Sequence, residues 1–242
     1  MPNHSKAAEG FFDRSNKNSS PFPRLVFTIL RAIDPYLQSI LIFNGFGHQI
    51  LSKAGITTVP AGPKGAVLVA MAAGCAVKQI INMTYILETR MINSAVIGIC
   101  LYNTISNSFA SLSSIIYGPS NELGSLQYIG ISLFTVGIFT ELISELQRKR
   151  FKDNPANKGK LYTGGLFSLA RHINYGGYTL WRTGLALTSG NYWLAALQLS
   201  WHLWYFTKQG VPDIANYCSE RYGDEWKNYE HNVPNILFPY IW

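Results

Sequence analysis

The sequence predicts an all-α integral membrane protein, a polytopic bundle of about five or six transmembrane helices, and three observations lead to this class. Hydrophobic residues make up 48% of the 242 residues and charged residues only 14%, whereas an ordinary soluble domain carries about 25% charged residues. The apolar residues are concentrated in long runs that no linker-like stretch divides. The net charge of +7 comes from basic residues near the ends of these runs, which favours a membrane topology signal over a nucleic-acid interface.

The first two apolar runs predict two helices. A helix from Phe22 to Phe46 contains Arg31 and Asp34, which are three residues apart and therefore share a helical face where they can pair. After a segment rich in glycine, proline and lysine, the run from Gly65 to Leu87 is long enough to cross the roughly 30 Å hydrocarbon core of a bilayer. Lys78 lies in the middle of this run, where we expect it either to snorkel to the interface or to form an interior pair.

Four further apolar segments complete the predicted bundle. The run from Met91 to Asn121 contains no charged residue and ends in a turn-like Tyr-Gly-Pro-Ser-Asn sequence. The next run, from Leu123 to Leu142, is expected to be broken by Glu141 and Glu145 and then by the basic sequence Arg-Lys-Arg-Phe-Lys. The fifth and sixth segments, joined by a Ser-Gly-Asn turn, are Gly177 to Leu187 and Tyr192 to Phe206.

The positions of the basic residues predict the orientation of the bundle, because short cytosolic loops are enriched in lysine and arginine. The basic residues that fall on the predicted cytosolic side are Arg14, Lys17, Arg24, Arg90 and the run from Arg148 to Lys152. Lys53 and Lys64 fall on the other side and oppose this orientation mildly. We expect both termini to be cytosolic, with residues 1–21 as a disordered tail, residues 22–144 as N-terminal membrane helices on the lipid-pocket side and residues 145–242 as a C-terminal functional region.

Common signatures of soluble nucleotide-binding and metal-binding proteins are missing from the sequence. No GxGxxG or GxxxxGK[ST] motif occurs, and no histidine pair has zinc-ligand spacing. Cys75, Cys100 and Cys218 lie far apart without CxxC spacing, so we expect buried, reduced thiols and no metal site. A cofactor would therefore have to bind in another way.

Polar residues gather in the stretch from Leu161 to Tyr178, which leads into the fifth apolar segment. Arg171, His172, Asn174 and Tyr175 lie here, between a glycine-containing turn and residues expected to be embedded in the membrane. Charged and polar side chains beside hydrocarbon are costly unless they face the protein interior or a cavity, so such a cluster is a functional-site hypothesis by default. We therefore place the candidate site at the cytosolic end of this segment.

Three sequence blocks follow one another between Glu145 and Trp242. The first contains Gln147, Phe151, Lys152, Asn154 and Pro155; the second contains Ala170, Arg171, His172, Asn174, Tyr175 and Gly177; the third contains Cys218, Tyr222, Gly223, Trp226, Tyr229, Val233, Pro234 and Pro239. In order and spacing these blocks resemble QKxxFRxNP, ARHxNYxG and CxxKYGxxWxxYxxxVPxxxxP. Those motifs belong to the C-terminal half of the membrane sterol reductases, including delta-14 and delta-7 sterol reductase relatives, and of the related steroid 5-alpha-reductase C-terminal domain family.

This resemblance implies an NADPH-dependent reductase of a carbon–carbon double bond in a sterol, steroid or isoprenoid-like lipid, located in the endoplasmic reticulum membrane. Hydride would pass to one carbon while an acid protonates its neighbour. Carried over position by position, the resemblance implies cofactor contacts at Arg148, Lys152, Phe167, Arg171, His172, Asn174, Tyr175, Cys218, Arg221, Tyr222 and Tyr229. Cations suit the phosphates, and aromatic rings offer stacking faces. The alternative is that Tyr222, Trp226 and Tyr229 form only an interfacial aromatic belt.

The position of the proton donor departs from the family pattern. The resemblance implies Asp or Glu where this chain has Tyr178, and the charged residues that usually precede the third block are also missing. A phenol can donate a proton when it is hydrogen-bonded to a cation or a carboxylate. We therefore expect Tyr178 or Tyr175 as the catalytic acid, with Glu145 or Glu141 to orient or replace it.

Two alternatives to the reductase follow from the same residues. Isoprenylcysteine methyltransferases, which use S-adenosylmethionine, have a similar RHPxY element and a closing segment with Gly, Tyr and Val-Pro, and they also lack the acid at the position of Tyr178. They usually carry a pair of glutamates before that closing segment, where this chain reads Pro212, Asp213, Ile214 and Ala215. The second alternative is a non-catalytic lipid-binding relative that keeps the fold.

Overall fold

Long apolar helices determine the architecture of this chain. The computed structural model describes residues 12–13, 20–117 and 121–241. Four of the described helices are long and apolar enough to cross a membrane, namely α1 (Pro21–Phe43), α3 (Pro63–Ile81) with the π-helical turn that continues it (Asn82–Ile86), α4 (Asn93–Ser114) and α5 (Ser125–Asp153). The predicted all-α membrane bundle is confirmed.

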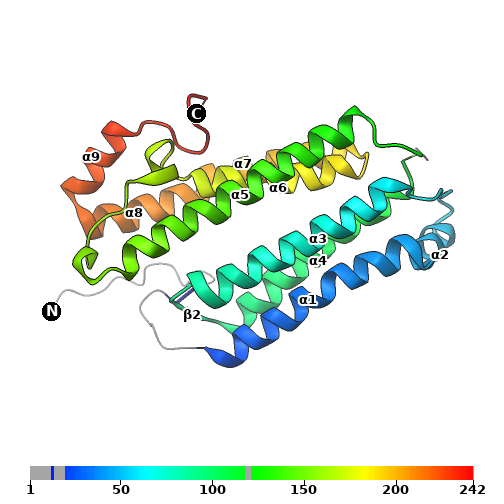
Figure 1. Ribbon diagram of the computed structural model, residues 1–242, viewed down its shortest axis with the longest axis horizontal. Coiled ribbons are helices and arrows are strands. Elements are labelled where there is room, and N and C mark those ends of the chain that lie inside the picture. Colours follow the sequence, from blue (N-terminus) through cyan, green and yellow to red (C-terminus); the bar gives the residue numbers. More distant parts are fainter. Residues whose placement is uncertain (1–11, 14–19, 118–120, 242) are drawn as a thin grey trace.

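The N-terminal helices form one group within the bundle. Figure 1 shows α1, α3 and α4 side by side, and each of them contacts the other two. The short helix α2 (Phe46–Lys53) follows α1 after a turn at Gly45, whose φ of 76° lies in the left-handed region that favours glycine. Arg31 and Asp34 of α1 pair as predicted, with 3.2 Å between Nη2 and Oδ2.

The C-terminal helices form the second group. Helix α6 (Ile173–Thr188) runs antiparallel along α5, and α7 (Tyr192–Tyr205) packs on α6. The backbones of α5 and α6 approach closely because glycines face each other: a Cβ atom at Gly137 would lie 2.5 Å from the backbone nitrogen of Trp181. About two helical turns further along the same contact, a Cβ atom at Gly184 would lie 2.5 Å from the carbonyl oxygen of Gly130. Small residues are a common means of helix association in membranes.

Helix α5 is longer than the sequence predicts, and the expected break at Glu141 and Glu145 is wrong. Glu141 pairs with Lys78 of α3, and its Oε2 accepts a hydrogen bond of 2.7 Å from Nε1 of Trp181. Glu145 accepts from Asn174 of α6. Because both carboxylates have partners inside the protein, they do not end the helix, which continues to Asp153. Lys78 forms the interior pair that was one of its two expected roles.

The last part of the chain returns to the end of α5. Helix α7 ends at Tyr205, one residue before the predicted boundary, and the chain continues through a π-helical turn (Phe206–Gly210) into α8 (Val211–Tyr222). Gly223, with a φ of 54°, permits the turn into α9 (Asp224–Asn232). Figure 1 shows α8 and α9 at one end of the bundle, beside the C-terminal end of α5.

A short strand pair lies at the same end of the bundle. Strand β1 (Phe12–Asp13) pairs antiparallel with β2 (Arg90–Met91), and Oγ of Ser20 accepts a 3.2 Å hydrogen bond from the Met91 backbone nitrogen. Phe12–Asp13 belong to the tail that is expected to be disordered, and β2 supplies backbone partners for these two residues. Residues 1–11 and 14–19 of that tail, and residues 118–120 of the turn expected after α4, lie outside the described residues.

Candidate functional site

The centre of the candidate site is the carboxylate of Glu145, near the C-terminal end of α5. Its Oε1 accepts a 2.7 Å hydrogen bond from Nδ2 of Asn174 on α6, and its Oε2 pairs with Arg148 one turn further along α5. The side chain of Glu145 is 7% exposed and that of Arg148 is 41% exposed, so the carboxylate is enclosed while the guanidinium reaches the surface. We call Glu145, Arg148, Asn174 and the rings around them the Glu145 site.

Aromatic rings enclose one side of this site. The guanidinium carbon of Arg148 lies 5.6 Å from the centre of the Phe167 ring, a cation–π distance. The backbone oxygen of Phe167 accepts a 2.7 Å hydrogen bond from the hydroxyl of Tyr229 on α9, and burial raises the pKa of that phenol. The segment before α6 and helix α9 are thus held together at the edge of the site.

Arg171 connects the segment before α6 to the C-terminal segment that follows α9. Its Nη1 donates to the backbone oxygens of Glu230 at 3.1 Å and Val233 at 2.8 Å. The backbone nitrogen of Arg171 donates to the backbone oxygen of Asn235 at 3.0 Å, and that of His172 donates to the backbone oxygen of Ile236 at 2.8 Å. In this structure Arg171 therefore acts on protein carbonyls, and its predicted contact with a cofactor phosphate stays a prediction.

His172 precedes α6 and is buried. Its Nε2 has no hydrogen-bond partner among the described residues. Burial, and then the charges of Arg171 and Arg148, lower its pKa from 6.5 to about 4, so the imidazole is neutral at neutral pH. Its ring stacks on Tyr175 at 5.6 Å, and Tyr175 stacks on Phe206 at 4.4 Å, which makes a row of rings leading from the site into the bundle.

The third predicted block also reaches this end of the bundle. Cys218, Tyr229 and Trp226 are buried in one apolar cluster with Val233, and Tyr222 packs against it with a pKa that burial raises. Trp226 and Tyr229 are therefore core residues of this end rather than a belt facing lipid. Arg221 lies on the outside of α8 against Tyr217 and Tyr222. The charges of Arg148 and Arg221 both act on Lys152.

A groove opens beside these residues. Its volume is about 440 Å³, and it is lined by Leu161, Thr163, Glu225, Asn228, Tyr229, Asn232 and Val233. Of the residues predicted to contact a cofactor, Tyr229 alone is in this lining. The amide side chains of α9 offer donors and acceptors there.

Tyr178 lies deeper in the bundle than the Glu145 site. It follows Asn174 by one helical turn on α6, and its hydroxyl accepts a 3.3 Å hydrogen bond from Nε of Arg182. Its ring packs edge-on against His202 at 5.1 Å. The described contacts of Tyr178 are with this deeper group, so its role as a catalytic acid stays a prediction.

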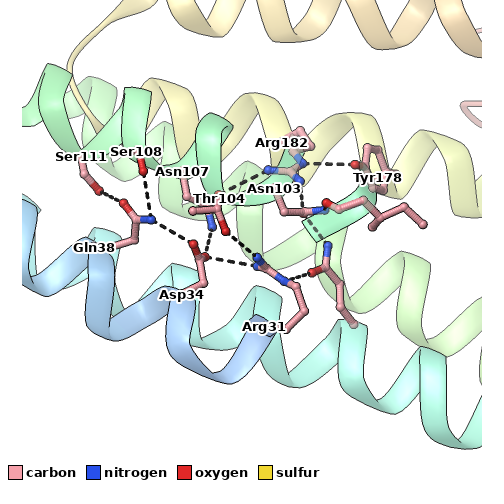
Figure 2. Close-up of polar contacts among 12 residues, drawn as sticks. Arg31, Asp34, Gln38, Asn103, Thr104, Asn107, Ser108, Ser111, Tyr178 and Arg182 are labelled. Atoms are coloured by element: carbon pink, nitrogen blue, oxygen red, sulfur yellow. Dashed lines mark hydrogen bonds and ion pairs between the residues drawn. The ribbon is translucent and has the colours of Figure 1, made fainter. Parts of the chain in front are cut away.

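Sequence reasoning missed the polar residues that surround Arg182. Figure 2 shows the Arg182 guanidinium beside Asn103 and Asn107 of α4, in a network that continues to Asp34 and Arg31 of α1. The signal that points to Arg182 is a charged residue inside an apolar segment. Its partners lie in another apolar segment of the chain, where asparagines carry no comparable signal.

Fold and site together define a class, a helical membrane protein with a polar and aromatic site at one end of its C-terminal helix group. The chain belongs to the family described as "Protein of unknown function (DUF1295)", whose model matches residues 78–233. This family is steroid 5-alpha-reductase-like, so the predicted resemblance is confirmed.

Curated relatives of this chain are named as methyltransferases. A probable O-methyltransferase, ustE, of Ustilaginoidea virens is 32% identical over 239 residues, which covers 88% of this chain and 84% of the relative. A protein-S-isoprenylcysteine O-methyltransferase of Schizosaccharomyces pombe is 31% identical over 87 residues, covering 36% of this chain and 34% of that protein. A probable protein-S-isoprenylcysteine O-methyltransferase of Oryza sativa subsp. indica is 23% identical over 57% of this chain and 75% of its own length. These names indicate an enzyme but give no support to an oxidoreductase.

Proposed function

We propose that this protein is an S-adenosylmethionine-dependent O-methyltransferase acting on a lipid-soluble substrate within the membrane. The observation that carries the proposal is the 32% identity to the probable O-methyltransferase of Ustilaginoidea virens, which extends over 88% of this chain and therefore includes both helix groups. Shorter similarity to isoprenylcysteine methyltransferases supports the same class.

The chemistry of the Glu145 site fits S-adenosylmethionine. The cofactor has two cationic groups, a carboxylate, ribose hydroxyls and an adenine ring. The enclosed carboxylate of Glu145 suits a cation or the hydroxyls, and the half-exposed guanidinium of Arg148 suits the carboxylate. The buried Nε2 of His172, which has no partner among the described residues, offers one further hydrogen bond. Residues that would hold the cofactor are thus Glu145, Arg148, His172 and Asn174.

In this proposal the cofactor supplies an electrophilic methyl group carried on a sulfonium. The residues of the Glu145 site would position the cofactor and enclose it. Asn174 fixes the direction of the Glu145 carboxylate, and the Phe167 ring presents its electron-rich face to the guanidinium of Arg148. Tyr175 stacks on His172 and Phe206 and excludes water from this end of the site. Orientation of two reactants in one dry site is itself a large contribution to rate.

A specific observation favours a second candidate, the NADPH-dependent lipid double-bond reductase that the sequence blocks imply. Arg148 and Lys152 lie four residues apart on α5, and Arg221 lies on α8 at the same end of the bundle, so three cations are found where α5 ends beside α8. Such a group suits the phosphates of NADPH, and S-adenosylmethionine has none. In this candidate Tyr178 or Tyr175 is the proton donor.

Isothermal titration of the detergent-purified protein separates the two candidates. We expect S-adenosylhomocysteine, the demethylated product, to bind, and NADPH and NADH not to bind. Asn174→Ala should weaken S-adenosylhomocysteine binding about tenfold, because the carboxylate of Glu145 loses the group that orients it. Arg150→Gln, an exposed change on α5, the helix that carries Glu145, is the control. Saturable binding of NADPH without binding of S-adenosylhomocysteine would replace the first candidate with the second.

We also propose that the protein resides in the endoplasmic reticulum with both termini on the cytosolic side. The proposal rests on the apolar helices and on the basic residues that flank them. Protease treatment of intact microsomes should remove tags from both ends. Protection of either tag contradicts the orientation.

A further inference from the structure

A second polar centre lies deeper in the bundle, around Arg182 of α6. This residue is 2% exposed, although it lies in a segment that is otherwise apolar. Among the described residues, no carboxylate forms an ion pair with it. A buried cation without a carboxylate is costly in a membrane protein, so it calls for a functional explanation.

Two buried ion pairs lie on the helices that pack around Arg182. Arg31 pairs with Asp34, and Lys78 pairs with Glu141. Asp34 is also occupied by hydrogen bonds from Gln38 and Asn107 at 3.0 and 2.7 Å. Figure 2 shows Asn107 between Asp34 and Arg182, so the two charges face opposite sides of one neutral amide. Three of these five charged groups are positive and two are negative, and among the described residues the positive charge of Arg182 has no carboxylate partner.

Among the described residues, three acceptors receive hydrogen bonds from the guanidinium of Arg182. Its Nε, Nη1 and Nη2 donate to the Tyr178 hydroxyl at 3.3 Å, to the Asn107 amide oxygen at 3.3 Å and to the Asn103 amide oxygen. All three acceptors are neutral. A guanidinium has five N–H groups, and these three hydrogen bonds use three of them. The remaining two suit a planar anion such as a carboxylate.

The surroundings of Arg182 are aromatic and uncharged. Its guanidinium carbon lies 4.4, 5.1 and 5.6 Å from the ring centres of Trp181, Tyr102 and Tyr178. Nδ1 of His202 is 2.7 Å from the backbone oxygen of Gln198, which can only accept, so Nδ1 carries the proton. Nε2 of His202 therefore accepts from the Tyr102 hydroxyl at 2.8 Å, and neither group supplies a negative charge.

We propose that Arg182, with Tyr102, Tyr178 and His202 around it, is a binding site for an anionic oxygen group, a carboxylate or a phenolate, on the lipid-soluble substrate. Asn174, Tyr178 and Arg182 follow one another at four-residue intervals on α6, so the site lies roughly 12 Å deeper than the Glu145 site. The row of rings from His172 through Tyr175 to Phe206 leads toward it, and Phe206 lies 5.7 Å from Tyr178. The assignment of the ligand as substrate rests on the proposed function; the binding of the anion does not.

Binding of radiolabelled dodecanoate to the protein in nanodiscs, without any cofactor, tests this inference. We expect saturable binding that unlabelled dodecanoate displaces and its neutral methyl ester does not. An alkyl nitrophenol that is ionised at neutral pH is the second competitor. Displacement by dodecanoate alone assigns a carboxylate site, and displacement by both assigns a site for either anion. Displacement by the methyl ester as well as by dodecanoate overturns the proposal, because the pocket would then recognise only the chain.

Variants of Arg182 and of its partner Asn103 connect the binding to Arg182. Arg182→Gln should weaken dodecanoate binding about tenfold or more, while Arg182→Lys keeps part of it and Arg150→Gln changes nothing. If Arg182→Gln does not fold, Asn103→Asp serves instead, because it places an internal carboxylate against the guanidinium and should abolish binding. Unchanged dodecanoate binding in Asn103→Asp or in folded Arg182→Gln overturns the site. Titration of S-adenosylhomocysteine into the same samples tests the proposed function separately.

Discussion

The two helix groups of this bundle are held together in different ways. Helices α1, α3 and α4 meet through buried polar side chains: Asp34 of α1 accepts from Asn107 of α4, and Gln79 of α3 donates to Asn103 of α4 at 2.6 Å. Helices α5 and α6 meet through glycines, with Gly137 against the backbone of Trp181. Lipid tails are as apolar as leucine, so helices in a membrane associate by hydrogen bonds and close packing rather than by the hydrophobic effect.

The difference has consequences for the two polar centres. The glycine contact fixes the spacing of α5 and α6, which carry Glu145 and Asn174, so the Glu145 site lies on a closely packed pair of helices. Arg182 instead lies where the two groups meet, because it extends from α6 to Asn103 and Asn107 of α4. The Glu145 site is therefore built within the C-terminal helix group, and the polar centre around Arg182 lies between the two helix groups.

The largest loss of stability is expected where α1, α3 and α4 meet through polar side chains. Asp34→Leu removes the carboxylate that neutralises Arg31, and both residues are fully buried. Removal of one partner of a buried ion pair costs about 3 to 5 kcal/mol, so thermal or chemical unfolding in detergent should show a loss of this size. The double variant Arg31→Leu with Asp34→Leu leaves no unpaired charge and should recover part of the stability. A double variant less stable than Asp34→Leu would contradict the charge argument.

A smaller loss of stability is expected where α5 and α6 meet through glycines. Gly137→Ala places a methyl group 2.5 Å from backbone atoms that cannot move aside easily, and overpacking of this kind costs about 1 to 3 kcal/mol. The matched control is Gly74→Ala on α3, where the added carbon would meet Phe134 at an ordinary 3.7 Å. Gly74→Ala should be neutral or slightly stabilising, because alanine favours helix more than glycine does. Equal stability of the two variants would show that α5 and α6 do not depend on close approach.

These contrasts also show what the sequence can predict. Apolar runs locate α1, α3, α4 and the first part of α5, because the hydrocarbon core requires a minimum length. The pairing of Arg31 with Asp34 was predictable because both partners lie on one helix at a spacing of three. The polar stretch from Leu161 to Tyr178 contains Asn174, which donates to Glu145, and His172, which stacks on Tyr175.

The failures have one physical cause, which is that the partner lies far away in the sequence. Glu141 reads as a helix break until Lys78 of α3 is known to face it. Arg182 reads as a charge in an apolar helix until Asn103 and Asn107 of α4 are placed beside it. Tertiary contacts decide whether a charge ends a helix or is buried in it, and spacing along one helix carries no information about them.

Lowering the pH is expected to reduce the free energy of unfolding by about 1 kcal/mol through His172, which precedes α6. The folded protein holds His172 with a pKa of about 4, below the 6.5 of the unfolded chain, so the unfolded state binds more protons between these values. The contribution is fully present above pH 6.5 and is lost as the pH falls toward 4. Between pH 7.5 and 5.5 the wild type should lose about 1 kcal/mol more stability than His172→Asn, measured by chemical unfolding. Parallel pH profiles of the two proteins would contradict a buried neutral imidazole.

The smallest change is expected for Tyr178→Phe, at the junction of the two helix groups. The phenol accepts one hydrogen bond of 3.3 Å from Arg182, and the ring contacts with Trp181 and His202 are kept in phenylalanine. Loss of one such bond costs about 0.5 to 1.5 kcal/mol. If the protein transfers a methyl group, Tyr178 donates no proton to the product, and turnover in a methyl-transfer assay should fall by less than about tenfold. If it reduces a double bond with Tyr178 as the acid, turnover should fall about 10² to 10⁴-fold with NADPH affinity nearly unchanged. The variant therefore measures whether the phenol is part of the chemistry or part of the contact between α6 and the polar helix group.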